Sequence, residues 1–320
     1  MPTHIRWVTV PLNVRPVVPS RLRGRSPHGS GRAPRTVIAG YVALTKPRII
    51  ELLLITTVPA MVLADRGWPG LSLVAVTLLG GTLAAGGANA INMYVDRDID
   101  ALMERTKNRP LVTGLIAPRN ALVFAVILEV LAFGVLWAGA NVLSGALALS
   151  ATLFYVFVYT LWLKRSSTQN IVIGGAAGAV PVLVGWSAVT NSLGWEPWIL
   201  FLVIFLWTPP HFWALAIRHS DDYRVAGVPM LPVVAEHGRV VRSMVRYTVA
   251  LVVSTLVLVP VAEMGWVYSI SATVLGLMFL WGTVALARSG SETASMRLFS
   301  FSISYLSLLF LALTVDVLVR

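Results

Sequence analysis

A polar stretch, Asn89 to Pro110, follows a long apolar run and carries residue types that bind metals and anions. Its 22 residues hold four acids and four bases, although the whole chain has only 14 acids: Asp96, Asp98, Asp100, Glu104, Arg97, Arg105, Lys107 and Arg109. If the preceding helix continues, Asn92, Asp96 and Asp100 share one face and Asp98 points elsewhere. Three oxygen-bearing side chains suit a hard cation, and the bases suit an anion. The stretch is therefore predicted to bind a metal-chelated phosphate.

A second polar segment follows the sixth apolar run and supplies two more carboxylates, Asp221 and Asp222, between Arg218 and Arg224. An isolated Asp-Asp pair is most often a surface turn. This pair is predicted to lie on the same membrane side as the first acidic stretch, and that placement favours a shared site.

His211 lies inside the sixth apolar run, directly after Pro209 and Pro210. The prolines are expected to break or kink the helix and to free backbone carbonyls. An ionisable residue within a span is a functional candidate, although a bond to a freed carbonyl would also explain it. Trp207 and Trp213 stand beside it and could line a flat ligand.

Two further basic groups lie at the ends of apolar runs, namely Lys46 with Arg48, and Lys164 with Arg165. Either group could be a topology anchor or an anion ligand.

The composition is that of a polytopic membrane protein. Of the 320 residues, 57% are hydrophobic and 12% are charged, about half the charge of a soluble domain. There is no cysteine, which excludes disulfides, zinc–thiolate sites and cysteine nucleophiles.

The net charge of +11 does not indicate nucleic-acid binding, because much of it is concentrated in an N-terminal tail. Residues 1–36 hold seven arginines and no acid. We expect residues 1–37 to form a disordered basic cytoplasmic tail; an organelle transit peptide is the alternative.

Nine apolar segments predict an all-α bundle of nine transmembrane helices around a central cavity, formed by residues 38–320. They cover residues 48–65, 71–94, 119–138, 142–162, 170–190, 197–217, 243–262, 266–287 and 298–318. With the N-terminus in the cytoplasm and the C-terminus outside, 23 of the 25 Lys and Arg residues lie inside, as the positive-inside rule requires. Both polar segments then face the cytoplasm.

The chain lacks a Walker lysine loop, a dinucleotide glycine fingerprint and a nucleophile elbow. What remains is a set of carboxylates for Mg²⁺, a set of bases for a polyanion, and an apolar cavity. A substrate with a diphosphate head and an isoprenoid tail matches all three.

The motifs resemble those of the UbiA-type intramembrane prenyltransferase superfamily. The resemblance begins with Asn92-x3-Asp96-x3-Asp100, followed by Arg105-Thr106-x2-Arg109-Pro110. Three further stretches resemble the haem-modifying branch of that superfamily: TKPRIIE from Thr45, PPHFWALA from Pro209, and Asp221-Asp222-Tyr223 with AGVPMLPV from Ala226. The likeness covers about residues 38–318.

The resemblance implies transfer of farnesyl from farnesyl diphosphate to a vinyl group of haem B, with Mg²⁺ as cofactor. It also implies a bacterial plasma membrane location, a cytoplasmic active site and haem A synthase as a partner that uses the product. The alternatives are a quinone or chlorophyll-type prenyltransferase and, in another class, a transporter.

The resemblance also assigns roles to residues. Asn92, Asp96 and Asp100 would hold Mg²⁺–diphosphate, and Asp96 and Asp100 would thereby be catalytic. The bases expected to neutralise the diphosphate are Arg105, Lys107, Arg109, Lys46, Arg48, Lys164 and Arg218. His211 would contact haem as a ligand or base, beside Trp207 and Trp213.

Many members carry a second Asp-x3-Asp, but Ala226 stands four residues after Asp222. Asp221 and Asp222 would then bind the metal directly, or one would bind through water or orient Arg218.

Overall fold

The computed structural model describes residues 34–320, and every regular element in that range is helical. The prediction for residues 1–37 falls mainly outside the described residues. The first described helix, α1 (Pro34–Thr45), begins four residues before the predicted start of the membrane domain at residue 38.

Eight helices in the described range are long and apolar enough to span a bilayer. They are α3 (Leu71–Val95), α5 (Pro118–Gly139), the continuous helix Val142–Ser166, α8 (Asn170–Thr190), α9 (Trp195–Arg218), α12 (His237–Val261), α13 (Trp266–Ser289) and α14 (Glu292–Leu318). They match the eight later predicted segments, although α12 and α14 each begin six residues earlier than expected.

The first predicted span corresponds to α2 (Pro47–Asp65). Within it, the apolar stretch Leu54–Asp65 is shorter than a membrane span. The ninth span and the side on which each terminus lies therefore stay predictions.

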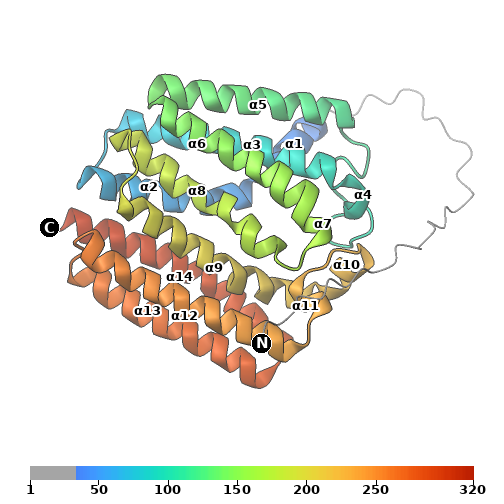
Figure 1. The fold of residues 1–320 in the computed structure, drawn as a ribbon. Coiled ribbons are helices and arrows are strands. Elements are labelled where there is room, and N and C mark those ends of the chain that lie inside the picture. The colour runs from blue at the N-terminus through green and yellow to red at the C-terminus, as the bar shows by residue number, and fades with distance from the viewer. Residues whose placement is uncertain (1–33) are drawn as a thin grey trace, which may run out of the picture. The chain divides into compact units, whose positions relative to one another are not determined.

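The long helices run side by side, and the short helices gather at one end of the bundle (Figure 1). The short helices are α4 (Arg97–Asp100), α7 (Lys164–Ser166), α10 (Ser220–Val225) and α11 (Leu231–Val234). Helix α2 packs against α3, α8 and α14, so the last helix lies beside an early one. This arrangement brings the two polar segments of the sequence to the same end of the bundle.

The prolines Pro209 and Pro210 are predicted to break or kink the helix; α9 runs through both, so a break is wrong. The φ angle of proline suits a helix, and the cost lies in the lost hydrogen bonds. Packing of α9 against α8, α12 and α14 holds the helix in place despite that loss.

Candidate active site

Asn92, Asp96 and Asp100 lie on one buried helical face. The backbone N–H of Asp96 donates to the Asn92 carbonyl at 2.9 Å, and that of Asp100 donates to the Asp96 carbonyl at 2.8 Å. The helical period therefore continues from α3 into α4. The three residues are only 3%, 0% and 1% exposed, whereas Asp98 lies outside and binds Arg165 through two 2.7 Å hydrogen bonds. The predicted geometry of this stretch is confirmed.

Three cations from three different elements meet this face. Lys46 Nζ donates to Asn92 Oδ1 at 2.8 Å, Lys164 donates to Asp96 Oδ2, and Arg109 donates to Asp100 Oδ2 at 2.6 Å. Burial, together with the nearby charges of Arg109 and Lys164, lowers the pKa of Lys46 to about 7. The bases outnumber the carboxylates that they meet, and such crowded positive charge favours a bound polyanion.

The residues of this face fit a hard cation. Asp96 Oδ1 is buried and has no hydrogen-bond partner, although the Arg165 guanidinium lies 3.7 Å away. A buried carboxylate oxygen without a full partner is costly, and it is the kind of ligand that Mg²⁺ prefers. Within residues 34–320, no three acidic or histidine side chains already surround a single point. The carboxylates are held by bases instead.

The two aspartates of the second polar segment, Asp221 and Asp222, lie in different surroundings. Asp222 accepts long hydrogen bonds from the backbone N–H groups of Glu104 and Arg105, at 3.3 and 3.5 Å. Asp221 is exposed and pairs with Arg224. Asp222 thus ties the second polar segment to the first, while Asp221 faces outward.

Four predicted diphosphate ligands lie away from the buried face. Arg218 pairs with Glu292 of α14 at 3.5 Å, so the structure brings it to neither aspartate. Lys107 pairs with exposed Glu104 at 2.5 Å, Arg105 lies beside the Tyr223 hydroxyl, and Arg48 is exposed in the first turn of α2.

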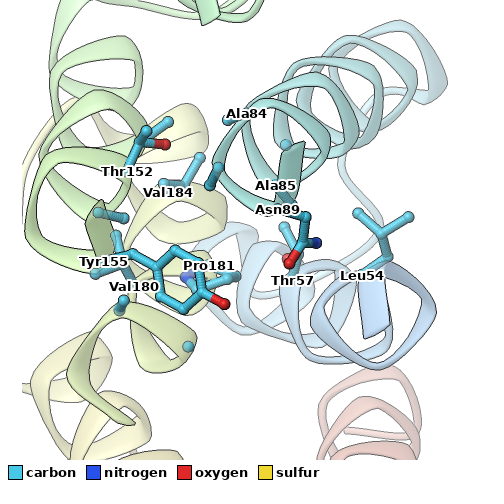
Figure 2. A pocket seen from close by; sticks show the side chains of 16 residues that line it. Leu54, Thr57, Ala84, Ala85, Asn89, Thr152, Tyr155, Val180, Pro181 and Val184 are labelled. Atoms are coloured by element: carbon cyan, nitrogen blue, oxygen red, sulfur yellow. The ribbon is translucent and has the colours of Figure 1, made fainter. Parts of the chain in front are cut away.

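An apolar pocket adjoins the polar face. It encloses about 180 Å³ and is partly open. Most of its lining is small or aliphatic, drawn from α2, α3, α6 (Val142–Leu153) and α8. The polar ends of Asn89 and Tyr155 point into it (Figure 2). Asn89 precedes Asn92 by three residues on α3, and Tyr155 lies near Asp96 and Asp100. Asn89 and Tyr155 therefore lie between the pocket and the polar face.

A π-helix, η1 (Phe154–Leu163), supplies several of these contacts at the C-terminal end of the fourth predicted span. Tyr155 lines the pocket, Thr160 accepts a hydrogen bond from Asn92, and Lys164 follows directly. Segments of π-helix occur frequently at functional sites. Tyr155 and Thr160 were not predicted as site residues from the sequence, because no residue type or spacing indicates a π-helix.

His211 lies in an aromatic stack between α9 and α14. Its ring stacks on Trp207 at 4.1 Å and on Phe299 at 4.7 Å between centroids, and its Nδ1 lies 2.6 Å from Ser302 Oγ. Trp213 instead packs on Tyr247 of α12. His211 and Trp207 are four residues apart and share a helix face, whereas Trp213 is two residues further and lies on the other side. The predicted haem contacts are thus not gathered in one place.

The comparisons with known proteins agree with this geometry. Residues 53–312 match the UbiA prenyltransferase family. The chain is 52% identical over 307 residues to the protoheme IX farnesyltransferase of Streptomyces avermitilis, covering 94% of this chain and 99% of that protein. It is 56% identical over 290 residues to that of Frankia alni, covering 88% and 99%.

Two solved structures share the fold. A digeranylgeranylglyceryl phosphate synthase superposes with a TM-score of 0.74 at 17% identity, covering 89% of this chain and all of that one. A UbiA homologue from Archaeoglobus fulgidus bound to DMAPP and Mg²⁺ superposes with a TM-score of 0.62 at 20% identity, covering 87% and 99%. The polar face, the adjoining apolar pocket and the matched relatives lead to one conclusion: this chain is a multi-pass membrane prenyltransferase that belongs to the UbiA prenyltransferase family.

Proposed function

We propose that this chain transfers the farnesyl group of farnesyl diphosphate to a vinyl group of haem B, giving haem O and diphosphate. The observation that carries the proposal is the identity of about one residue in two, over nearly the whole chain, to curated protoheme IX farnesyltransferases. The polar face and its adjoining pocket support it, because they match a diphosphate head and a prenyl tail.

The polar face would receive the diphosphate. Lys46, Arg109 and Lys164 now neutralise the motif side chains. When diphosphate arrives, these bases exchange their partners for phosphate oxygens. Asn92, Asp96 and Asp100 would thereby be freed to hold Mg²⁺, which would supply charge stabilisation to the leaving group. The related Archaeoglobus structure with DMAPP and Mg²⁺ supports a metal here.

The second polar segment would close the site. Asp222 already touches the loop that carries Arg105, so it is the better candidate of the two aspartates for a further metal contact. Arg105 and Lys107 lie on the same loop and would add positive charge. Arg48, Arg218 and Asp221 have to change position before they can contribute.

The apolar pocket would hold the farnesyl chain and exclude water. The C–O bond of farnesyl diphosphate breaks, the electron pair leaves with diphosphate, and the allylic cation is attacked by the haem vinyl group. Water adds to the resulting cation and a proton is released, which gives the hydroxyethylfarnesyl group. A dry wall of alanine, glycine and valine prevents water from capturing the allylic cation first.

His211 is the proposed haem contact. Ser302 Oγ donates its one hydrogen to the Phe299 carbonyl at 2.6 Å. With the hydroxyl hydrogen so placed, His211 Nδ1 donates to Ser302 Oγ. Nε2 is left with its lone pair, and it has no hydrogen-bond partner in residues 34–320. Nε2 would thus be available to ligate the haem iron or to accept a proton, and Trp207 would lie beside the haem. Trp213 has no part in that contact without a rearrangement of α9.

The proposed setting is the bacterial plasma membrane, with the site facing the cytoplasm, as the distribution of basic residues favours. An enzyme that oxidises haem O, such as a haem A synthase, would consume the product.

The test is haem O formation, followed by chromatography, in membranes given haem B, farnesyl diphosphate and Mg²⁺. We expect product from the intact protein and a loss of at least about 100-fold in Asp96→Ala, since the leaving-group charge is no longer stabilised. Absence of product from the intact protein would overturn the proposal.

The same membranes test the haem contact. His211→Ala should weaken haem binding, measured as the haem concentration that gives half of the Soret change, and should reduce haem O formation. Trp213→Phe is the matched control on the other face of α9 and should leave both unchanged. Wild-type haem affinity and synthesis in His211→Ala would exclude this role.

A further inference from the structure

Thr160 occupies an unusual place between the π-helix and the metal motif. It is fully buried, at 0% exposure, near the C-terminal end of the membrane-spanning helix Val142–Ser166. Its Oγ1 lies 2.9 Å from the carbonyl oxygen of Tyr155 and 3.1 Å from Nδ2 of Asn92. One hydroxyl therefore links η1 to the first residue of the metal motif.

The π-helix is what turns Thr160 toward that motif. Lys164 follows Tyr155 by nine positions. In an α-helix, nine positions make about two and a half turns, so the two side chains would lie on opposite sides. A π-helix has about 4.4 residues per turn, so nine positions make about two turns and the two side chains lie on the same side. Tyr155, Thr160 and Lys164 therefore form one row, and they meet the pocket, Asn92 and Asp96 respectively.

The hydrogen bonds fix the direction of the Asn92 amide. A threonine hydroxyl has one hydrogen, and here it goes to the Tyr155 carbonyl, so Oγ1 can only accept from Asn92. The second hydrogen of Asn92 Nδ2 goes to Asp96 Oδ2 at 2.8 Å. Both amide hydrogens are thus committed, and Oδ1 faces the other way, toward Lys46.

Only the oxygen of an asparagine amide can ligate a hard cation, because the NH₂ group has no available lone pair. We propose that Thr160 is a positioning residue, which presents Asn92 Oδ1 to the metal–diphosphate by holding the opposite end of the amide. The proposal rests on the function proposed above. Without Thr160, the amide keeps one anchor and can turn its NH₂ group toward the cation.

The test uses Thr160→Val, which keeps the shape but removes the hydroxyl, with Thr160→Ser as the conservative rescue. Binding of Mg²⁺ with inorganic diphosphate to the purified full chain is measured by calorimetry, and the Mg²⁺ concentration for half-maximal haem O formation is measured in parallel. We expect Thr160→Val to weaken binding about 10- to 100-fold, as loss of a group that orients a ligand does, and Thr160→Ser to restore it. Unchanged binding in Thr160→Val overturns the proposal.

Thr77→Val is the matched control, because Thr77 is also fully buried and its hydroxyl bonds only a backbone carbonyl. It should bind Mg²⁺ and diphosphate as the wild type does. Should Thr160→Val fail to fold, Thr160→Ala supplies the same comparison.

The Asn92→Asp background separates orientation from a general structural effect. A carboxylate presents an oxygen whichever way it turns, so adding Thr160→Val to Asn92→Asp should change Mg²⁺ affinity far less than in the wild type. An equal loss in both backgrounds means that Thr160 acts only on packing, and it overturns the proposal. If the intact protein binds Mg²⁺–diphosphate normally yet makes no haem O, the proposed function fails while the role of Thr160 stands.

Discussion

Lys164 and Asp96 form a buried charge pair at the centre of the polar face, with side chains 11% and 0% exposed. A pair of this kind contributes little net stability while it is intact, but removal of one partner leaves an uncompensated charge. In the proposed reaction, the Lys164 amine would leave Asp96 and bind a phosphate oxygen.

Lys164→Met keeps the aliphatic stem and removes the charge. We expect it to lower the free energy of unfolding by about 3 kcal/mol, because Asp96 stays buried without its cation, and to abolish diphosphate binding. Adding Asp96→Asn should restore stability but not activity. Denaturant unfolding in detergent measures the free energy of unfolding of each variant. The exposed pair of Arg224 with Asp221, at 60% and 90%, is the control: Arg224→Met should cost less than about 0.5 kcal/mol. Equal costs in the two single variants would contradict this interpretation.

At the scale of elements, the pocket depends on how closely α2 approaches α8. A Cβ atom added at Gly185 of α8 would lie 2.6 Å from the backbone oxygen of Thr57 on α2. Backbone cannot move aside as a flexible side chain can, so only glycine permits this approach. Thr57 and the neighbouring Val184 both line the pocket, and the contact therefore sets the position of two of its walls.

Gly185→Ala should separate the two helices and destabilise the protein by about 1–3 kcal/mol, the usual cost of overpacking. It should also weaken the binding of farnesyl diphosphate. Gly134→Ala on α5 is the matched control, since a Cβ there meets nothing within 4 Å. Thermal unfolding, with and without farnesyl diphosphate, measures both effects. A melting temperature for Gly185→Ala equal to that of Gly134→Ala would refute the argument.

At the scale of the whole molecule, the predicted topology assigns each end of the bundle to one side of the membrane. The polar face and the short helices share one end (Figure 1), which the basic residues predict to be cytoplasmic. The chain has no cysteine, so a single introduced cysteine is its one thiol.

Thr36→Cys and Ser289→Cys should react with a membrane-impermeant maleimide only after cells are opened, whereas Gly70→Cys should react in intact cells. Thr36, Gly70 and Ser289 are all exposed. Labelling measured by mass shift decides whether α2 crosses the membrane. If Thr36→Cys and Gly70→Cys react from the same side, the chain has eight spans rather than nine.

The sequence by itself determined the helical fold, the family and the helix face that Asn92, Asp96 and Asp100 share. Apolar run length identifies membrane helices without reference to neighbours, and the helical period alone puts Asn92, Asp96 and Asp100 on one side. The same period could have separated His211 from Trp213, which were grouped only because they are close in the chain.

Tertiary structure decided which bases reach that face. Lys46, Arg109 and Lys164 come from three separate elements, while Arg218 pairs with Glu292 on α14, which is far away in the sequence but packs against α9. It also decided the role of Thr160, because the turn from α- to π-helix at Phe154 changes which side chains share a face. These contacts depend on packing between helices that are far apart in the sequence, so the spacing of residues within one segment cannot predict them.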